Sequence, residues 1–521
     1  MSYLSSPRIH FFGAFIAEPS TINNSGGNFG GPVVQPGWNP DGDHQFAFAD
    51  TTVSALVDDS GVCTSGDPLI GGAVSTPGSP FAKLVDLDVE AQMVSRIFGL
   101  QVAITGSDGH GVTGTMTTAS FRDFFGARLL GVYQSTLTEL TWNVSGSSWL
   151  GKLKALSPTC LSIRFIVDLY TGMSPGGAHR GRLAGTIAPG IDGQPALYVP
   201  ARRLIGTSGP STLAQLDGST LTVDVGNVLP VAANGDFSES SLVVATKAPT
   251  DIDTAIKTGQ RPFAATVLPA GWTALGVVPT TLARYKITSG VESLLLSAED
   301  AARAACTPLG LFTTNGTAVA LEADDGLFVF PGRQALAIDP GCSDSLELTA
   351  SRFGQPAGGV SITVVGNKNA GAPGLTFPAS LTTAADGIVA LPFQASDPGT
   401  PRPAIDGQVF GVGGPWADAS DIQIIDVKSA IAIRVFSGFT PPPNPTWTQV
   451  QPVLAQYNKL YPAMKAIIDL DDPNAVAAAA SEIRAALLLP VDDPGHMPVT
   501  RDLSEQKRRM IIEWIDAGSP V

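Results

Sequence analysis

An arginine and a histidine alternate with apolar residues near the start of the chain. Arg8 and His10 lie in the run "PRIHFFGAFIAEPSTINN", and Ile9 and Phe11 flank the histidine. In a strand, side chains two apart share a face, so this spacing predicts that Arg8 and His10 lie together, opposite the two apolar side chains. Such a pair could bind a carboxylate in a catalytic site. It could equally be a structural hydrogen-bonded pair that holds the N-terminal segment.

Two carboxylates at strand spacing form a second candidate. Asp86 and Asp88 occur in "KLVDLDVEAQMVSRIFG" and could bind a hard metal ion or act as a general acid and base. They could instead be turn-forming or capping residues before a short helix over Val89–Arg96. If the protein is catalytic, we expect Arg8, His10, Asp86 and Asp88 to carry the chemistry, and we leave the presence of a metal open.

A local group of arginines stands out in an acidic chain. Arg180, Arg182, Arg202 and Arg203 lie near His179 and could neutralise an acidic ligand, or they could be surface residues on hairpins. No G-x-S-x-G or HExxH motif is present, which disfavours the common serine hydrolases and zinc proteases. The Gly-rich stretch 23–40 lacks a phosphate-binding motif and is interpreted as a surface loop.

Composition narrows the class of protein further. The 521 residues carry a formal net charge of −15, which makes nucleic acid and anionic lipid unfavourable partners. Apolar residues make up 44% of the chain, yet no apolar run approaches the length of a membrane helix, and the first 17 residues do not resemble a secretory signal. We therefore expect a cytoplasmic protein with no membrane partner. The four cysteines lack metal-binding spacing and are interpreted as free thiols.

The pattern of the elements predicts a mainly β, multidomain protein. Short runs rich in Val, Ile, Leu and Thr alternate with turn residues through most of the chain. We expect a β-rich unit over residues 1–300, an immunoglobulin-like sandwich over 320–437 with a tight Asp-Gly turn, and a Pro-rich linker over 438–446. Apolar residues at helical spacing then predict a three-helix unit over 447–521.

The sequence also predicts the bounds of two of these helices. The stretch Ala475–Leu489 is rich in alanine and predicts one helix. The last helix is expected to begin after Ser504 as N-cap and to end at Gly518.

Both ends of the chain resemble one family. The opening run, residues 7–24, is similar to the start of the violacein-pathway protein VioB and of the chromopyrrolic acid synthases. The segments "VLAQYNKLYPAM" and "MPVTRDLSEQKRRMIIEWI" resemble the helical segment that closes the β-rich front half of the same family. The family joins this half to a ferritin-like domain and is associated with haem and with oxidative coupling of tryptophan-derived imines. We find no pattern of such a domain in the 521 residues.

The C-terminal helices also resemble a cytochrome c-type domain. In that resemblance Met497 takes the place of an axial iron ligand, with His496 beside it. The two cysteines and the histidine that attach haem are missing, so covalent haem is excluded. This leaves a degenerate, haem-free domain, or non-covalent haem held by Met497 or His496.

Two functional hypotheses follow from these observations. The first is a stand-alone relative of the family's front half, which acts in specialised metabolism on an aromatic or amino-acid-derived small molecule. The second is a non-catalytic binding or scaffold protein for a separate oxidative partner. The sequence leaves the substrate and the oligomeric state open.

Overall fold

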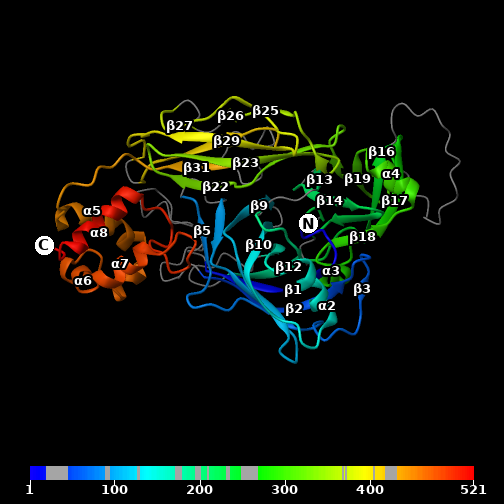
Figure 1. Cartoon of the computed structure of the whole chain (residues 1–521), viewed down its shortest axis with the longest axis horizontal. Coiled ribbons are helices and arrows are strands. Elements are labelled where there is room, and N and C mark those ends of the chain that lie inside the picture. Colours follow the sequence, from blue (N-terminus) through cyan, green and yellow to red (C-terminus); the bar gives the residue numbers. More distant parts are fainter. Residues whose placement is uncertain are drawn as a thin grey trace.

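In the computed structural model β-strands are the main regular element, and a small helical unit lies at the C-terminal end (Figure 1). This confirms the predicted fold class, a mainly β protein of several units. The described residues are 1–18, 45–88, 94–125, 130–169, 179–193, 201–207, 210–229, 231, 235–247, 268–366, 369, 372–402, 405–416, 431–460 and 462–520. The Gly-rich stretch 23–40 lies outside them.

The N-terminal unit is an antiparallel sheet that closes on itself. Because β10 pairs with β8 on one side and with β11 on the other, eight strands form a complete ring. Around the ring these are β11 (Leu161–Asp168), β12 (His179–Pro189), β1 (Arg8–Ala17), β2 (Phe46–Val57), β4 (Ala73–Ser75), β7 (Gln101–Thr105), β8 (Gly111–Met116) and β10 (Leu130–Asn143). The sheet is extended by β3 (Cys63–Thr64), β5 (Lys83–Asp86), β6 (Ser95–Phe98) and β9 (Ala119–Phe125), and α2 (Ser148–Leu156) follows β10.

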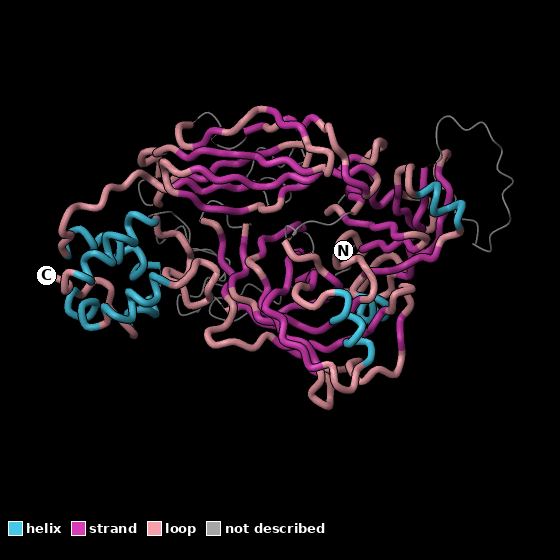
Figure 2. The backbone as a smooth tube through the Cα atoms, in the orientation of Figure 1, coloured by secondary structure: helices cyan, strands magenta, loops and turns pink. Residues whose placement is uncertain are grey.

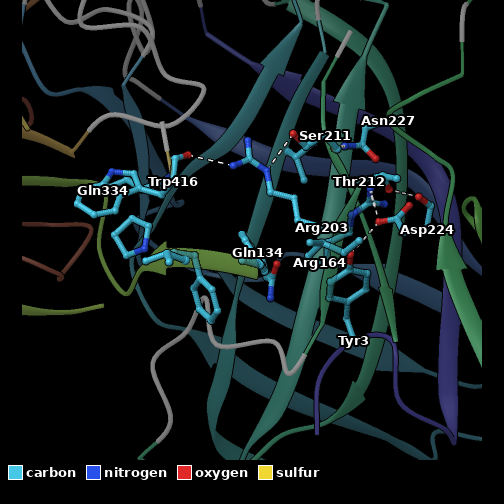
Figure 3. A pocket seen from close by; sticks show the side chains of 16 residues that line it. Tyr3, Gln134, Arg164, Arg203, Ser211, Thr212, Asp224, Asn227, Gln334 and Trp416 are labelled. Atoms are coloured by element: carbon cyan, nitrogen blue, oxygen red, sulfur yellow. Dashed lines mark hydrogen bonds and ion pairs between the residues drawn. The ribbon is translucent and has the colours of Figure 1, made fainter. Parts of the chain in front are cut away.

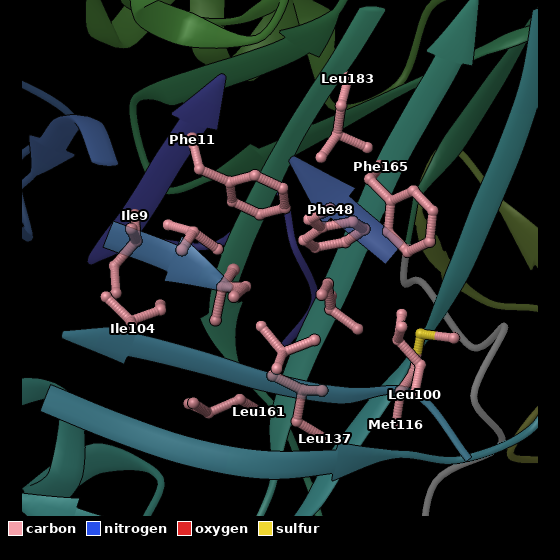
Figure 4. Close-up of a cluster of buried hydrophobic side chains, with 14 of the residues drawn as sticks. Ile9, Phe11, Phe48, Leu100, Ile104, Met116, Leu137, Leu161, Phe165 and Leu183 are labelled. Carbon is pink, nitrogen blue, oxygen red and sulfur yellow. The ribbon is translucent and has the colours of Figure 1, made fainter. Parts of the chain in front are cut away.

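Apolar side chains fill the inside of this closed sheet (Figure 4). Ile9 and Phe11 of β1 point inward, as do Phe48 of β2 and Phe165 of β11. The period of two that the sequence predicts for β1 is therefore confirmed. Because alternate side chains point outward, the outer face receives Arg8 and His10.

A second antiparallel sheet of eight strands follows in the chain. Its order is β17 (Trp272–Pro279), β16 (Ser241–Lys247), β19 (Leu309–Thr313), β20 (Ala318–Glu322), β13 (Arg202–Gly206), β14 (Thr212–Asp217), β15 (Thr220–Asp224) and β18 (Val291–Leu295), with α3 (Leu282–Thr288) and α4 (Ala298–Ala304) beside it. Arg202 and Glu322 form a buried ion pair, with Nε 2.9 Å from Oε1. The range 1–300 thus contains the closed sheet and most of this second sheet.

The third unit is a sandwich of two sheets over one apolar core. One sheet contains β21 (Leu327–Pro331), β23 (Ser343–Arg352), β29 (Ile388–Ala395), β27 (Leu375–Thr376) and β24 (Gln355–Pro356). The other contains β22 (Ala335–Ile338), β31 (Ile431–Val435), β30 (Gln408–Gly413) and β26 (Val365–Gly366), and β25 (Ser361–Thr363) pairs with β28 (Ser380–Thr382). The predicted Asp-Gly turn is present before β29, where Gly387 has a φ of +80°, a conformation that glycine adopts readily.

The helices of the C-terminal unit gather at one end of the molecule (Figure 2). They are α5 (Trp447–Leu460), η3 (Pro462–Ala466), α6 (Pro473–Ala478), α7 (Ala480–Leu488) and α8 (Glu505–Asp516). Ser504 caps α8 as predicted, and Gly518 follows its end with a φ of +87°. The single helix predicted over Ala475–Leu489 is wrong in detail, because the chain breaks at Ala479 into α6 and α7.

A second correction concerns the short helix predicted over Val89–Arg96. Ser95 and Arg96 belong to strand β6, and residues 89–93 lie outside the described part of the chain. Arg96 pairs with Val85 of β5 and with Ser120 of β9, so cross-strand pairing overrides the local tendency to form a helix. Among the described helices, none is long and apolar enough to span a membrane.

Candidate functional site

The Arg8 and His10 side chains lie between the closed sheet and the second sheet. Arg8 Nε donates to His10 Nε2 at 3.3 Å, and Arg8 Nη2 donates to Ser293 Oγ of β18 at 2.7 Å. His10 Nδ1 lies 2.9 Å from Thr186 Oγ1. Since Nε2 accepts from Arg8, Nδ1 carries the proton and donates to Thr186. Both ring nitrogens are therefore engaged within the protein.

The electrostatics of this pair keep the histidine neutral. His10 is completely buried, and this burial lowers its pKa well below the usual value, with the positive charges of Arg8 and Arg284 acting in the same direction. Arg8 also donates to Leu4 O and Ser6 Oγ, so it holds the N-terminal segment against β1. Arg8 and His10 thus form the hydrogen bonds expected of a structural pair that holds the N-terminal segment.

The two aspartates lie elsewhere, where the closed sheet meets the sandwich. Asp86 Oδ1 accepts from Ser95 Oγ at 2.5 Å, and Asp88 Oδ2 lies 2.8 Å from Arg402 Nη2. Burial raises the pKa of Asp86 well above its usual value, and nearby Asp88 raises it further, against the bond from Ser95. These contacts are to β6 and to the sandwich, so the structure does not bring the aspartates together with the Arg8 pair.

The predicted haem ligands occupy the loop between α7 and α8. His496 is buried, with Nδ1 2.7 Å from Leu489 O, and the backbone N of Met497 donates to Ala486 O at 3.2 Å. The centre of the helical unit is filled by its own apolar side chains, including Trp514, whose ring centroid lies 5.5 Å from that of Trp447. These residues do not fit a haem group held between the helices.

A cavity lies where the closed sheet, the second sheet and the sandwich meet (Figure 3). We call it the junction cavity, and it has a volume of about 50 Å³. Its lining comes from the N-terminal segment (Tyr3), the closed sheet (Val132, Gln134, Arg164), the second sheet and adjoining loops (Arg203, Ser211, Thr212, Leu213, Asp224, Asn227) and the sandwich (Phe328, Val329, Phe330, Pro331, Gln334, Trp416).

The strand register explains how the closed sheet contributes to this cavity. Gln134 of β10 pairs with Arg164 of β11, Arg164 pairs with Thr186 of β12, and Thr186 pairs with His10 of β1. These four polar side chains therefore form one row across the outer face. Neighbouring strands lie about 4.8 Å apart, which places His10 roughly 10 Å from Arg164 and outside the cavity lining.

Five side chains of the cavity have buried polar atoms without a hydrogen-bond partner among the described residues. They are Gln134 Nε2 and Oε1, Arg164 Nε and Nη1, Asn227 Oδ1, Gln334 Oε1 and Trp416 Nε1. Each unpartnered buried group costs about 1–3 kcal/mol, so five side chains approach the roughly 5–15 kcal/mol that stabilises a folded protein. Buried polar groups in folded proteins are generally satisfied by protein, water or ligand, which makes this cavity a candidate binding site.

A buried ion pair forms one wall of the cavity. Arg164 Nη2 lies 2.7 Å from Asp224 Oδ2, which also accepts from the Tyr3 hydroxyl at 2.9 Å. Asp224 Oδ1 accepts from the backbone N–H of Gly226 at 3.0 Å. The negative charge of Asp224 is therefore fully engaged by the protein.

Arg203 forms part of the opposite wall. Its Nε donates to Ser211 Oγ and its Nη1 donates to Trp416 O, both at 3.0 Å. Its guanidinium also lies 5.9 Å from the centre of the Phe328 ring. Both hydrogen-bond partners are neutral, which leaves the charge of Arg203 available to a bound molecule.

Sequence reasoning identified Arg203 as part of an arginine group but missed the rest of the cavity. The other arginines of that group are used elsewhere: Arg182 binds Asp168, Arg202 binds Glu322, and Arg180 contacts Asp50 at the surface. The side chain of His179 lies outside the described part. One signal was available, since Arg164 is a charged residue inside the apolar run "LSIRFIVD".

No group of three or more His, Cys, Asp or Glu side chains in the described ranges is arranged to hold a metal ion. No protein-family model matches the sequence, and no curated protein matches it. Two solved structures show a weak likeness, the S-layer protein rSbsC(31-844) and domains 1-6 of the surface layer protein SbsC. Each is 10% identical with a TM-score of 0.15, over 77% of this chain and 45% of the other. The chain thus spans less than half of their length, and likenesses this weak carry no argument.

Proposed function

We propose that the protein binds a small aromatic or amino-acid-derived molecule at the junction cavity. The observation that carries this proposal is the set of five buried side chains whose unpartnered polar atoms all line one cavity. Unpartnered buried groups are rare in folded proteins, and their concentration around one space is typical of a site that recognises a polar ligand.

The volume of the cavity indicates which part of a ligand it holds. A single water needs roughly 10–15 Å³ on this measure, so about 50 Å³ accommodates a polar group of a few atoms and not a whole aromatic molecule. Phe328 and Phe330, whose ring centroids lie 4.9 Å apart, also line the space and provide apolar contacts. A ligand whose polar group enters the cavity and whose apolar part contacts these rings matches both the small volume and the aromatic lining.

The resemblance of the chain ends to the front half of VioB and the chromopyrrolic acid synthases supports the chemical class of the ligand. Under this proposal the protein is a stand-alone relative of that half and acts in specialised metabolism. The resemblance motivates the choice of compounds, whereas the cavity supports binding independently of it.

Binding can be tested by isothermal titration calorimetry of the full chain with tryptophan, phenylalanine and their 2-oxo acids. Trp416→Phe removes the unpartnered Nε1–H and keeps a ring, so the loss of one hydrogen bond should weaken binding about tenfold. Trp142→Phe is a matched control, because Trp142 Nε1 donates to Pro158 O outside the cavity. If no compound binds, or if both variants weaken binding equally, the cavity is not the site.

A non-catalytic scaffold for a separate oxidative partner is the second candidate. It is favoured by His10, whose two ring nitrogens are both engaged and whose side chain has no exposed surface. A visible absorption spectrum and metal analysis of the purified protein separate the two roles. A haem band altered by Met497→Ala or His496→Ala would contradict the scaffold and support oxidative chemistry.

A further inference from the structure

Among the described residues, the lining of the junction cavity has one positive charge without an opposite charge paired to it. Its ionisable lining residues are Tyr3, Arg164, Arg203 and Asp224. Arg164 and Asp224 neutralise each other across 2.7 Å, and Tyr3 donates to the same carboxylate. Among the described residues, no carboxylate forms an ion pair with Arg203, whose two hydrogen bonds go to a hydroxyl and a backbone carbonyl.

Hydrogen-bond donors surround the same space. Gln134 Nε2 and Trp416 Nε1 each present a buried N–H without a partner in the described chain, and Arg164 presents two more through Nε and Nη1. Several donors that line one cavity together with an arginine match the chemistry of an acidic group with several acceptor oxygens.

We infer that the junction cavity selects ligands whose buried end is a singly charged anionic group of carboxylate size, and that Arg203 is its charged partner. This inference rests on the proposed function and adds the charge of the ligand to it. The acceptors Asn227 Oδ1 and Gln334 Oε1 remain for a donor on the same ligand.

The charge of the whole chain does not reverse this preference. The net charge of −15 repels anions at long range, but at about 0.1 M salt exposed charges are screened beyond roughly 10 Å. Arg203 is half-buried, so a contact with it inside the cavity is screened less than a contact at the exposed surface. The charge of Arg203 therefore contributes more to the affinity than the distant surface charges do.

The test compares phenylacetate with phenylacetamide, a neutral molecule of nearly the same shape, by calorimetric titration of the full chain. Because a hydrogen bond to a charged group is stronger than one between neutral groups, the anion should bind about 10-fold to 100-fold more tightly. Arg203→Gln should remove this difference, and Arg203→Lys should retain part of it. Arg352→Gln serves as a control, since Arg352 pairs with Asp325 at the surface of the sandwich.

Each outcome separates the two claims. Equal binding of both compounds, unaffected by Arg203→Gln, would overturn the charge preference and leave ligand binding intact. Anion preference that survives in Arg203→Gln would overturn the role of Arg203. If neither compound binds to the wild-type chain, and the amino acids and 2-oxo acids also fail, the cavity contains water alone and both claims fall.

Discussion

Asp224→Asn should destabilise the contact between the closed sheet and the second sheet. Asp224 and Arg164 are each 1% exposed, and their charged atoms lie 2.7 Å apart. Asparagine keeps the size of the side chain and can still accept one hydrogen bond, so the principal loss is the negative charge. Arg164 would then be a buried cation without a counter-charge, which costs about 3–5 kcal/mol.

The loss should be measured locally, because a chain of several units need not unfold in one step. Hydrogen exchange followed by mass spectrometry resolves peptides from β11 and β15, which carry the two partners. A loss of about 3–5 kcal/mol makes the open state roughly 150-fold to 5000-fold more populated, and amide exchange through that state is faster by the same factor. Peptides from α8 in the helical unit should not change.

Two comparisons make this reasoning refutable. Asp344→Asn removes an exposed partner of Arg333, at 2.9 Å, and should cost no more than about 1 kcal/mol. The double variant Arg164→Met with Asp224→Leu removes both charges and should recover most of the loss. The buried ion pair does not stabilise this contact if Asp224→Asn lowers the free energy of unfolding as little as Asp344→Asn does. The same conclusion follows if the double variant is no more stable than Asp224→Asn.

Three further predictions concern stability. Because burial lowers the pKa of His10, the unfolded chain binds a proton below about pH 6.5 and the folded chain does not, so the free energy of unfolding falls between pH 7 and 5. His10→Gln should reduce this fall by about 2 kcal/mol. An equal fall in the variant and the wild-type chain would contradict this prediction. Glu322→Gln leaves a fully buried arginine unpaired and should cost about 3–5 kcal/mol in urea unfolding of the second sheet, whereas a loss below about 1 kcal/mol would argue against it. Gly185→Ala places a Cβ 2.1 Å from the Phe11 ring and should cost about 1–3 kcal/mol in thermal unfolding. The control Gly151→Ala, in helix α2 with open space, should be neutral or stabilising by up to about 1 kcal/mol, so equal losses would refute the steric account.

Local patterns account for the parts of the fold that were predicted correctly. The alternation of Ile9 and Phe11 with Arg8 and His10 determines which face of β1 is apolar, because side chains alternate in any strand. Ser504 and Gly518 mark the ends of α8 because capping depends on residues within one turn. Arg96 shows the limit of such reasoning, since pairing with other strands determined its conformation.

The sequence by itself determined the mainly β class, the helical C-terminal unit and the face of β1 on which Arg8 and His10 lie, because these depend on spacing over a few residues. Only the tertiary structure decided that Gln134, Arg164, Arg203 and Trp416 line one cavity. They come from three units far apart in the chain, and no local pattern encodes a contact of that sequence separation. The candidate site follows from strand register and from packing between units, which arise only when the whole chain is folded.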